Sequence, residues 1–253
     1  MFKAFEKEHI CIAHRGLRAF YPENTMPAFE KSLNRFDMFE FDVHYTKDLK
    51  PVVIHDGDLR ELTDVSDRFD RYCVGELTLD EIKTLDNVSK FIKNNPFNKE
   101  LNIQELSDMN KNSIPHLDEV LAFIKQHSFP ANLEIKDSDI DEDYIIKDLR
   151  ERIEKFGVKD LVLISSYNHG YIKKLQKYHT AALFDYEMKD LKAYLKDLNV
   201  CAYHIDIDNF NKKTVSELLK ENIYTNVYTV NDKKKILDLF KMGVKGVFCD
   251  YFS

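Results

Sequence analysis

Four segments decide the fold and the chemistry expected of this chain: IAHRG (residues 12–16), PENT (22–25), FEFDV (39–43) and PVVIHD (51–56). Side chains alternate between the two faces of a strand, so Glu40 and Asp42 share the face opposite Phe39 and Phe41. A strand of a helix-covered parallel sheet is normally almost entirely apolar, because both of its faces are buried. Two carboxylates buried side by side are unfavourable unless a cation compensates their charge. We therefore expect a metal ion at this strand.

The rest of the chain alternates between short apolar runs typical of strands and amphipathic repeats typical of helices. Strand-like runs are expected at residues 10–13, 38–43, 132–136, 161–165, 181–184, 201–207, 226–230 and 246–249. Strict alternation of strands and helices predicts a parallel sheet. Eight such units predict the α/β fold of a (β/α)8 TIM barrel, whose active site lies at the C-terminal ends of the strands. An open doubly wound sheet is the alternative, but no GxGxxG motif follows the first strand.

The regular alternation is interrupted between residues 57 and 113. A structureless loop of this length is uncommon in a compact domain, and a linker would contain less Leu, Ile and Phe. We therefore expect an inserted lobe after the second strand, within a single domain that spans residues 1–253. A short run at residues 51–54 precedes the lobe and should pair antiparallel with the second strand. We expect the lobe to cover the mouth of the barrel and to limit the size of the substrate's headgroup.

The ring of outer helices is expected to lack its eighth member. Ser253 lies three residues after Asp250, so we expect no outer helix after the eighth strand. Either the N-terminal residues or the inserted lobe should cover the outside of the eighth strand, or that strand is left bare.

Charge and composition argue against several other functions. The net charge is −7 and no long basic run is present, so nucleic acid is not an expected partner. No segment has the character of a signal peptide or a membrane span, so we expect a cytoplasmic protein without stable membrane insertion. The four cysteines show no CxxC spacing, which favours reduced, structural thiols.

Three carboxylates are the candidate metal ligands. Glu40, Asp42 and Glu134 lie near the C-terminal ends of two predicted neighbouring strands. Oxygen ligands without paired Cys or His favour a hard cation, Mg2+ or Ca2+. The alternative is that Glu134 and Lys136, two residues apart on one strand face, form only a buried ion pair. Three carboxylates at adjacent strand ends favour the metal site.

Two histidines are the candidate general acid and general base. His14 follows the first strand and His55 ends the run at residues 51–54, so both should border the metal site. Arg15 and Lys136 are the candidate contacts to an anionic substrate. Tyr228 is a candidate for lining the site, although an aromatic residue on a barrel strand more often belongs to the core. No GxSxG motif indicates a serine nucleophile.

The motifs together resemble those of the glycerophosphodiester phosphodiesterase family. The match spans nearly the whole chain: HRG (14–16), PENT (22–25), ExDV (40–43), TKD (46–48), VVIHD (52–56), IPxLxEVL (114–121), LEIK (133–136), YTVND (228–232) and GVxGVFxDY (243–251). The family usually has Trp before TVN, whereas this chain has Tyr228 and no Trp at all, which affects the expected glycerol or headgroup contact. The helix that commonly follows DY in the family is absent.

The resemblance implies a barrel with an inserted lobe, one divalent cation, and hydrolysis of small glycerophosphodiesters to glycerol 3-phosphate and an alcohol. Carried over by motif, the three carboxylates look like metal ligands, the two histidines like the acid–base pair, and Arg15 and Lys136 like phosphate contacts. Lysophospholipids or a polyol-phosphate polymer are alternative substrates. A catalytically inactive phosphodiester-binding barrel is a third possibility, but none of the required side chains is lost.

No Ser, Cys or Thr stands out as the nucleophile that attacks phosphorus. A glycerophosphodiester carries its own nucleophile, the hydroxyl on the carbon next to the ester oxygen. Attack from within the substrate avoids the entropic cost of capturing a separate water molecule. We therefore expect a reaction through a cyclic phosphate, which water then opens.

Overall fold

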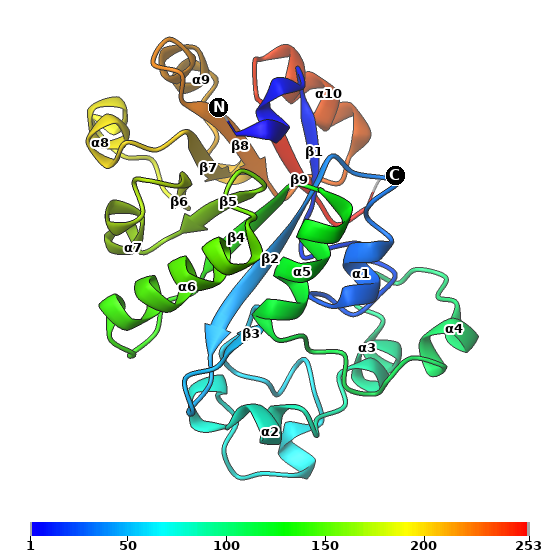
Figure 1. Ribbon diagram of the computed structural model, residues 1–253. Coiled ribbons are helices and arrows are strands. Elements are labelled where there is room, and N and C mark those ends of the chain that lie inside the picture. Colours follow the sequence, from blue (N-terminus) through cyan, green and yellow to red (C-terminus); the bar gives the residue numbers. More distant parts are fainter. Residues whose placement is uncertain (1, 252–253) are drawn as a thin grey trace.

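Eight parallel strands form a closed barrel in the computed structural model, which describes residues 2–251 (Figure 1). The first strand pairs with both the second and the last, and this closes the sheet. The TIM barrel predicted from the sequence is therefore confirmed, and the open sheet is not formed. The barrel strands are β1 (Ile10–Ala13), β2 (Met38–Tyr45), β4 (Ala131–Ile135), β5 (Val162–Ser166), β6 (His179–Phe184), β7 (Ala202–Asp206), β8 (Tyr224–Tyr228) and β9 (Gly246–Cys249).

The helices between the strands lie around the outside of the barrel (Figure 1). In the helix after β4, Ile145, Leu149 and Ile153 recur on one face and are buried, as the sequence pattern predicts. That helix begins where the Asp141 side chain accepts a hydrogen bond from the Tyr144 N–H, and it ends at Gly157. The outer helices are α1 (Met26–Glu30), α5 (Leu117–His127), α6 (Glu142–Phe156), α7 (His169–Lys174), α8 (Leu191–Leu198), α9 (Lys212–Leu219) and α10 (Lys233–Lys241).

A short antiparallel strand, β3 (Pro51–Val53), pairs with β2, as predicted from its short connection. After β3 the chain stays beside β2, because the Ile54 N–H donates to the Asp42 carbonyl (3.1 Å). The His44 ring also contacts the His55 carbonyl (3.0 Å). These two contacts fix His55 next to the carboxylates of β2.

Residues 57–113 form a lobe at the end of the barrel toward which β2 points (Figure 1). The lobe contains α2 (Leu79–Ile82), α3 (Val88–Asn94), α4 (Ile103–Ser107) and two 3-10 turns, η2 (Val65–Asp67) and η3 (Val74–Glu76). It has an apolar cluster of its own, which includes Leu59, Leu77 and Leu85 and also Val52 and Ile54 of the barrel side. The lobe is therefore packed rather than structureless, as the sequence predicts.

The N-terminal segment closes the opposite end of the barrel. Phe2 and Phe5, around the 3-10 turn η1 (Lys3–Glu6), are buried against the interior side chains of β1 and β9, including Ile12 and Phe248. This plugs the bottom of the barrel and leaves the candidate site residues at the other end. In the described part of the chain no helix is long and apolar enough to cross a membrane.

The outer face of β9, which has no outer helix after it in the described residues, is buried. Val247 and Cys249 are fully buried in the cluster that also contains Ile236 and Leu239 of α10. That cluster contains no residue of the lobe and none of the described residues before β1. The outer face of β9 is therefore buried, and the strand is not bare. No helix follows β9 within residues 2–251.

Candidate active site

The mouth of the barrel holds a cavity of about 160 Å3 at the C-terminal ends of the strands. Seven of the eight side chains singled out in the sequence line it, and the eighth, Asp42, is buried beside them. The seven are His14, Arg15, Glu40, His55, Glu134, Lys136 and Tyr228. No described residue of the lobe lines this cavity. The lobe instead borders a groove beside the mouth.

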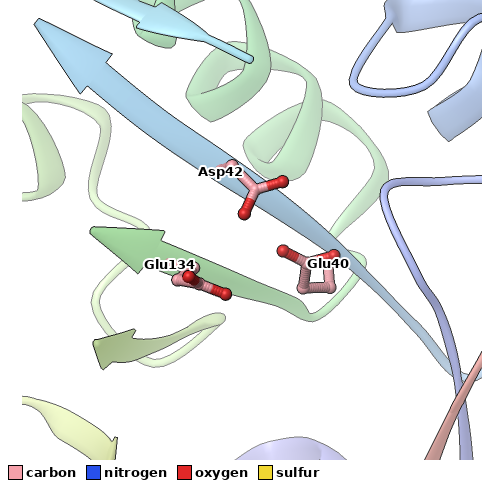
Figure 2. A group of neighbouring side chains, drawn as sticks. All are labelled: Glu40, Asp42 and Glu134. Atoms are coloured by element: carbon pink, nitrogen blue, oxygen red, sulfur yellow. The ribbon is translucent and has the colours of Figure 1, made fainter. Parts of the chain in front are cut away.

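Three carboxylates point toward one another across β2 and β4 (Figure 2). Parallel pairing places Asp42 opposite Glu134 and Glu40 opposite Asn132. One oxygen from each of Glu40, Asp42 and Glu134 lies within 4.8 Å of the others, and all three residues are buried. The alternation of β2 causes this, since its other face carries Phe39 and Phe41 into the core.

The electrostatics of this cluster fit a divalent cation. Burial, followed by repulsion from Asp42, raises the pKa of both Glu40 and Glu134. Glu40 Oε1 is buried and accepts no hydrogen bond from any described residue. The raised pKa values show that the negative charge of these carboxylates is not fully compensated by the protein. Carboxylate oxygens are the ligands that Mg2+ and Ca2+ prefer. The cluster could therefore hold one such ion.

Lys136 and Arg15 place two positive charges beside the carboxylates. Lys136 Nζ lies 2.9 Å from Asp42 Oδ1 and also bonds Glu134 Oε1. The ion pair considered as the alternative is therefore present together with the carboxylate cluster. Arg15 Nε lies 3.6 Å from Asp42 Oδ2. Burial alone would raise the pKa of Asp42, but Lys136 and Arg15 hold it below its ordinary value.

His14 is oriented by a carboxylate from the far end of the chain. Its Nδ1 lies 2.8 Å from Asp250 Oδ1, so the ring N–H donates to the carboxylate. Asp250 is held by Asn231, which donates to Oδ2 (2.8 Å) and accepts the Asp250 N–H (2.7 Å). Burial and the neighbouring Arg15 lower the pKa of His14 to about 4, against the opposing effect of Asp250. The imidazole is therefore neutral near pH 7.

His55 has an equivalent partner next to it in sequence. Its Nδ1 lies 2.5 Å from Asp56 Oδ1, and this hydrogen bond is the main cause of the lowered pKa of Asp56. The side chain of His55 is 30% exposed, so it is open to a ligand. Each catalytic candidate thus has Nδ1 engaged by a carboxylate, which leaves Nε2 as the nitrogen free for proton transfer.

Several residues of the site received no role in the sequence interpretation. Asp250, Asn231 and Asp56 orient the histidines, although their letters lie within the quoted motifs. Asn24 of the PENT segment donates to Asp42 Oδ2 (2.8 Å) and accepts the Asp42 N–H (3.1 Å). Their presence in the motifs could have marked these residues as candidates. The sequence could not show what they contact, because a partner can be as far as 236 positions away.

Tyr228 lies at the mouth, as predicted, but its hydroxyl is already engaged. It donates to the Phe184 carbonyl (2.7 Å) and lies 2.6 Å from the Tyr167 hydroxyl. Tyr167, at the end of β5, also lines the cavity and was not singled out in the sequence. The hydroxyl of Tyr228 thus already has partners within the protein.

The site is that of a TIM-barrel enzyme, since these proteins carry out their chemistry at the C-terminal ends of the strands. Residues 14–253 match the model of the glycerophosphoryl diester phosphodiesterase family. The chain is 33% identical over 247 residues to a glycerophosphodiester phosphodiesterase of Bacillus altitudinis, covering 95% of this chain and 94% of that one. It is 30% identical to one of Caldanaerobacter subterraneus subsp. tengcongensis, covering 95% and 93%.

A solved structure gives the same result. The phosphodiesterase of Oleispira antarctica, in complex with the product sn-glycerol-3-phosphate, superposes with a TM-score of 0.82 at 26% identity. The match covers 98% of this chain and 95% of that one. The chain therefore belongs to the glycerophosphoryl diester phosphodiesterase family, and it is a hydrolase of phosphodiesters.

Proposed function

We propose that this chain hydrolyses small glycerophosphodiesters to glycerol 3-phosphate and an alcohol, with one divalent cation, Mg2+ or Ca2+. The observation that carries the proposal is the meeting of two carboxylate-oriented histidines with three buried carboxylates at one cavity. The product bound in the Oleispira antarctica enzyme supports the same substrate class.

Glu40, Asp42 and Glu134 would hold the cation. When bound, it would supply positive charge to a phosphate oxygen and lower the pKa of a nearby hydroxyl. Arg15 and Lys136 would bind the remaining phosphate oxygens, Arg15 through its planar guanidinium. Asn24 keeps Asp42 in position through two hydrogen bonds.

The two histidines would move the protons of two successive displacements. One takes the proton of the glycerol 2-hydroxyl as its oxygen attacks phosphorus, and the other protonates the alcohol oxygen as its bond to phosphorus breaks. The product of this step is a five-membered cyclic phosphate. Water then attacks phosphorus with the histidine roles reversed, and the ring opens to glycerol 3-phosphate. Neutral His14 suits the first proton acceptor, which leaves His55 to protonate the alcohol.

The decisive experiment measures release of glycerol 3-phosphate from a panel of glycerophosphodiesters, with added Mg2+ or Ca2+ and with excess chelator. We expect turnover only with metal, and none for a diester whose glycerol 2-hydroxyl is replaced by hydrogen. Full activity in chelator would contradict the metal assignment. Cleavage of the deoxy diester near the parent rate would exclude the cyclic intermediate.

A matched pair of variants tests the metal site without relying on activity. A ligand that binds only the folded state raises the free energy of unfolding, by about 2.7 kcal/mol when the ligand concentration is a hundred times its Kd. The unfolding temperature rises accordingly. We expect Mg2+ or Ca2+ to raise the Tm of the parent and of Glu30→Gln, a change at an exposed position on α1. The increase should be lost in Glu40→Gln. An unchanged increase in Glu40→Gln would remove Glu40 from the ligand set.

A further inference from the structure

The floor of the mouth cavity carries two buried polar side chains that the proposed reaction does not use. Asn132 of β4 and His204 of β7 both line the cavity and are 1% and 0% exposed. Asn132 Nδ2 donates to Ser165 Oγ (2.9 Å), but its Oδ1 has no hydrogen-bond partner among residues 2–251. His204 Nε2 lies 3.0 Å from Asn226 Nδ2, and its Nδ1 likewise has none.

The protonation of His204 follows from its surroundings. Burial lowers its pKa to about 3, so the ring is neutral at physiological pH. With Asn226 donating to Nε2, the single ring proton is on Nδ1. Asn226 can lie there because the neighbouring position is Gly246: a Cβ at Gly246 would be 2.5 Å from Asn226 Oδ1. The floor therefore presents a donor, His204 Nδ1–H, and an acceptor, Asn132 Oδ1.

Buried polar atoms are rarely left without a partner, since each costs the free energy of its lost hydration. A hydroxyl group both accepts and donates a hydrogen bond, so a ligand hydroxyl at this floor would supply the kind of partner that each atom lacks. The position also fits the substrate. Parallel pairing sets Asn132 beside Glu40, so the floor adjoins the carboxylate cluster where the phosphate would bind. The cavity, of about 160 Å3, has room for a group the size of glycerol.

We propose that Asn132 and His204 bind the terminal hydroxyl of the glycerol end of the substrate and so determine specificity for glycerol. The proposal rests on the proposed function and adds a recognition element to it. An ordered water molecule could also donate and accept these hydrogen bonds. The experiment must therefore distinguish a bound substrate hydroxyl from a bound water molecule.

The first test uses the unaltered protein with its metal. Two diesters of the same alcohol are compared, one built on glycerol and one on 1,2-propanediol, which keeps the 2-hydroxyl and lacks only the terminal one. We expect kcat/KM to be lower for the propanediol diester by about 10- to 100-fold, the effect of leaving a buried donor and acceptor unpaired. Equal values would mean that the floor holds only water and would overturn the inference. Hydrolysis of neither diester would contradict the proposed function instead.

The second test assigns the discrimination to these residues. In Asn132→Leu, and independently in His204→Phe, the rate on the glycerol diester should fall toward that on the propanediol diester. Thr180→Val is the matched control, because its hydroxyl is also buried and unpartnered but does not line the cavity. This control should keep the full discrimination. Discrimination retained in folded Asn132→Leu and His204→Phe would overturn the assignment.

A binding measurement covers the case in which a variant fails to fold. Calorimetry on the unaltered protein compares glycerol 3-phosphate with the phosphate monoester of 1,2-propanediol that lacks the terminal hydroxyl. We expect Kd to be about 10- to 100-fold lower for glycerol 3-phosphate. Equal Kd values would overturn the inference without reference to catalysis or to any variant.

Discussion

At the scale of single residues, the proposed reaction would divide the proton transfers between His14 and His55. We predict that His14→Ala and His55→Ala each lower kcat by about 10²–10⁴-fold, the usual loss for a general acid or base. Stability should change little, because both side chains lie at the mouth rather than in the apolar core. Steady-state kinetics and thermal unfolding of both variants check this. Near-normal kcat in either variant would reduce that histidine to a structural role.

In the proposed reaction Asp250 would act through His14, as a positioning residue. Its carboxylate accepts the Nδ1–H and thereby keeps Nε2 free for the substrate. We predict that Asp250→Asn lowers kcat by about 10²-fold or more, since an amide can orient the wrong tautomer. The Asp250 carboxylate also raises the pKa of His14, so the acidic limb of the kcat profile should move to lower pH in the variant.

The control for that variant is Asp238→Asn on α10, which removes an exposed carboxylate paired with Lys241. Its kcat and pH profile should match those of the parent. A loss of kcat in Asp250→Asn without any change in the pH profile would point to a structural effect and not to control of His14.

At the scale of elements, the turn after β1 is the most constrained part of the site. It carries His14 and Arg15 into the mouth and then reverses at Gly16, which has φ +78°. A Cβ at Gly16 would lie 2.8 Å from the backbone and the Cβ of Ala28 in α1. Only glycine therefore permits both the left-handed backbone and the close packing of the turn on α1.

We predict that Gly16→Ala lowers the free energy of unfolding by at least about 1 kcal/mol and also lowers kcat, because the turn positions both His14 and Arg15. Gly75→Ala is the matched control, since a Cβ there would meet no atom within 4 Å. Denaturant unfolding and kinetics of the two variants provide the comparison. Equal free energies of unfolding for the two variants would show that the turn accommodates a side chain at position 16, and would contradict the prediction.

At the scale of the whole molecule, the lobe and the barrel share a groove of about 590 Å3 beside the mouth. Lobe residues Asp58, Arg60 and Glu61 line it together with His55 and Lys136. The lobe also shares its apolar cluster with Val52 and Ile54. We propose that lobe and barrel form a single domain, and that the groove receives the headgroup of the departing alcohol.

We predict that Arg60→Ala changes KM by about two- to fivefold for diesters with charged headgroups, the scale of an exposed charge contact. The kcat for the smallest diester should stay unchanged, because uniform binding affects KM alone. Arg68→Ala is the matched control, since Arg68 pairs with Asp64 and does not line the groove. A collapse of kcat on every diester in a folded Arg60→Ala protein would show that the lobe takes part in the chemistry.

Local patterns were sufficient to predict the barrel and to single out most residues of its candidate site. The alternation of apolar runs and amphipathic repeats predicts the strands and helices because each depends on neighbours within a few positions. The placement of Glu40 and Asp42 on one face of β2 follows from the same short-range geometry. A hairpin between β2 and β3 likewise follows from the length of their connection.

Contacts between distant segments decided the rest. The partner of His14 is Asp250, 236 residues away, and no periodicity links the two positions. Which surfaces fit together after the barrel closes decides the placement of the lobe beside the mouth, the plug of Phe2 and Phe5 and the burial of the outer face of β9. The polar floor of Asn132 and His204 exists for the same reason: the closed sheet brings strands three places apart around one cavity.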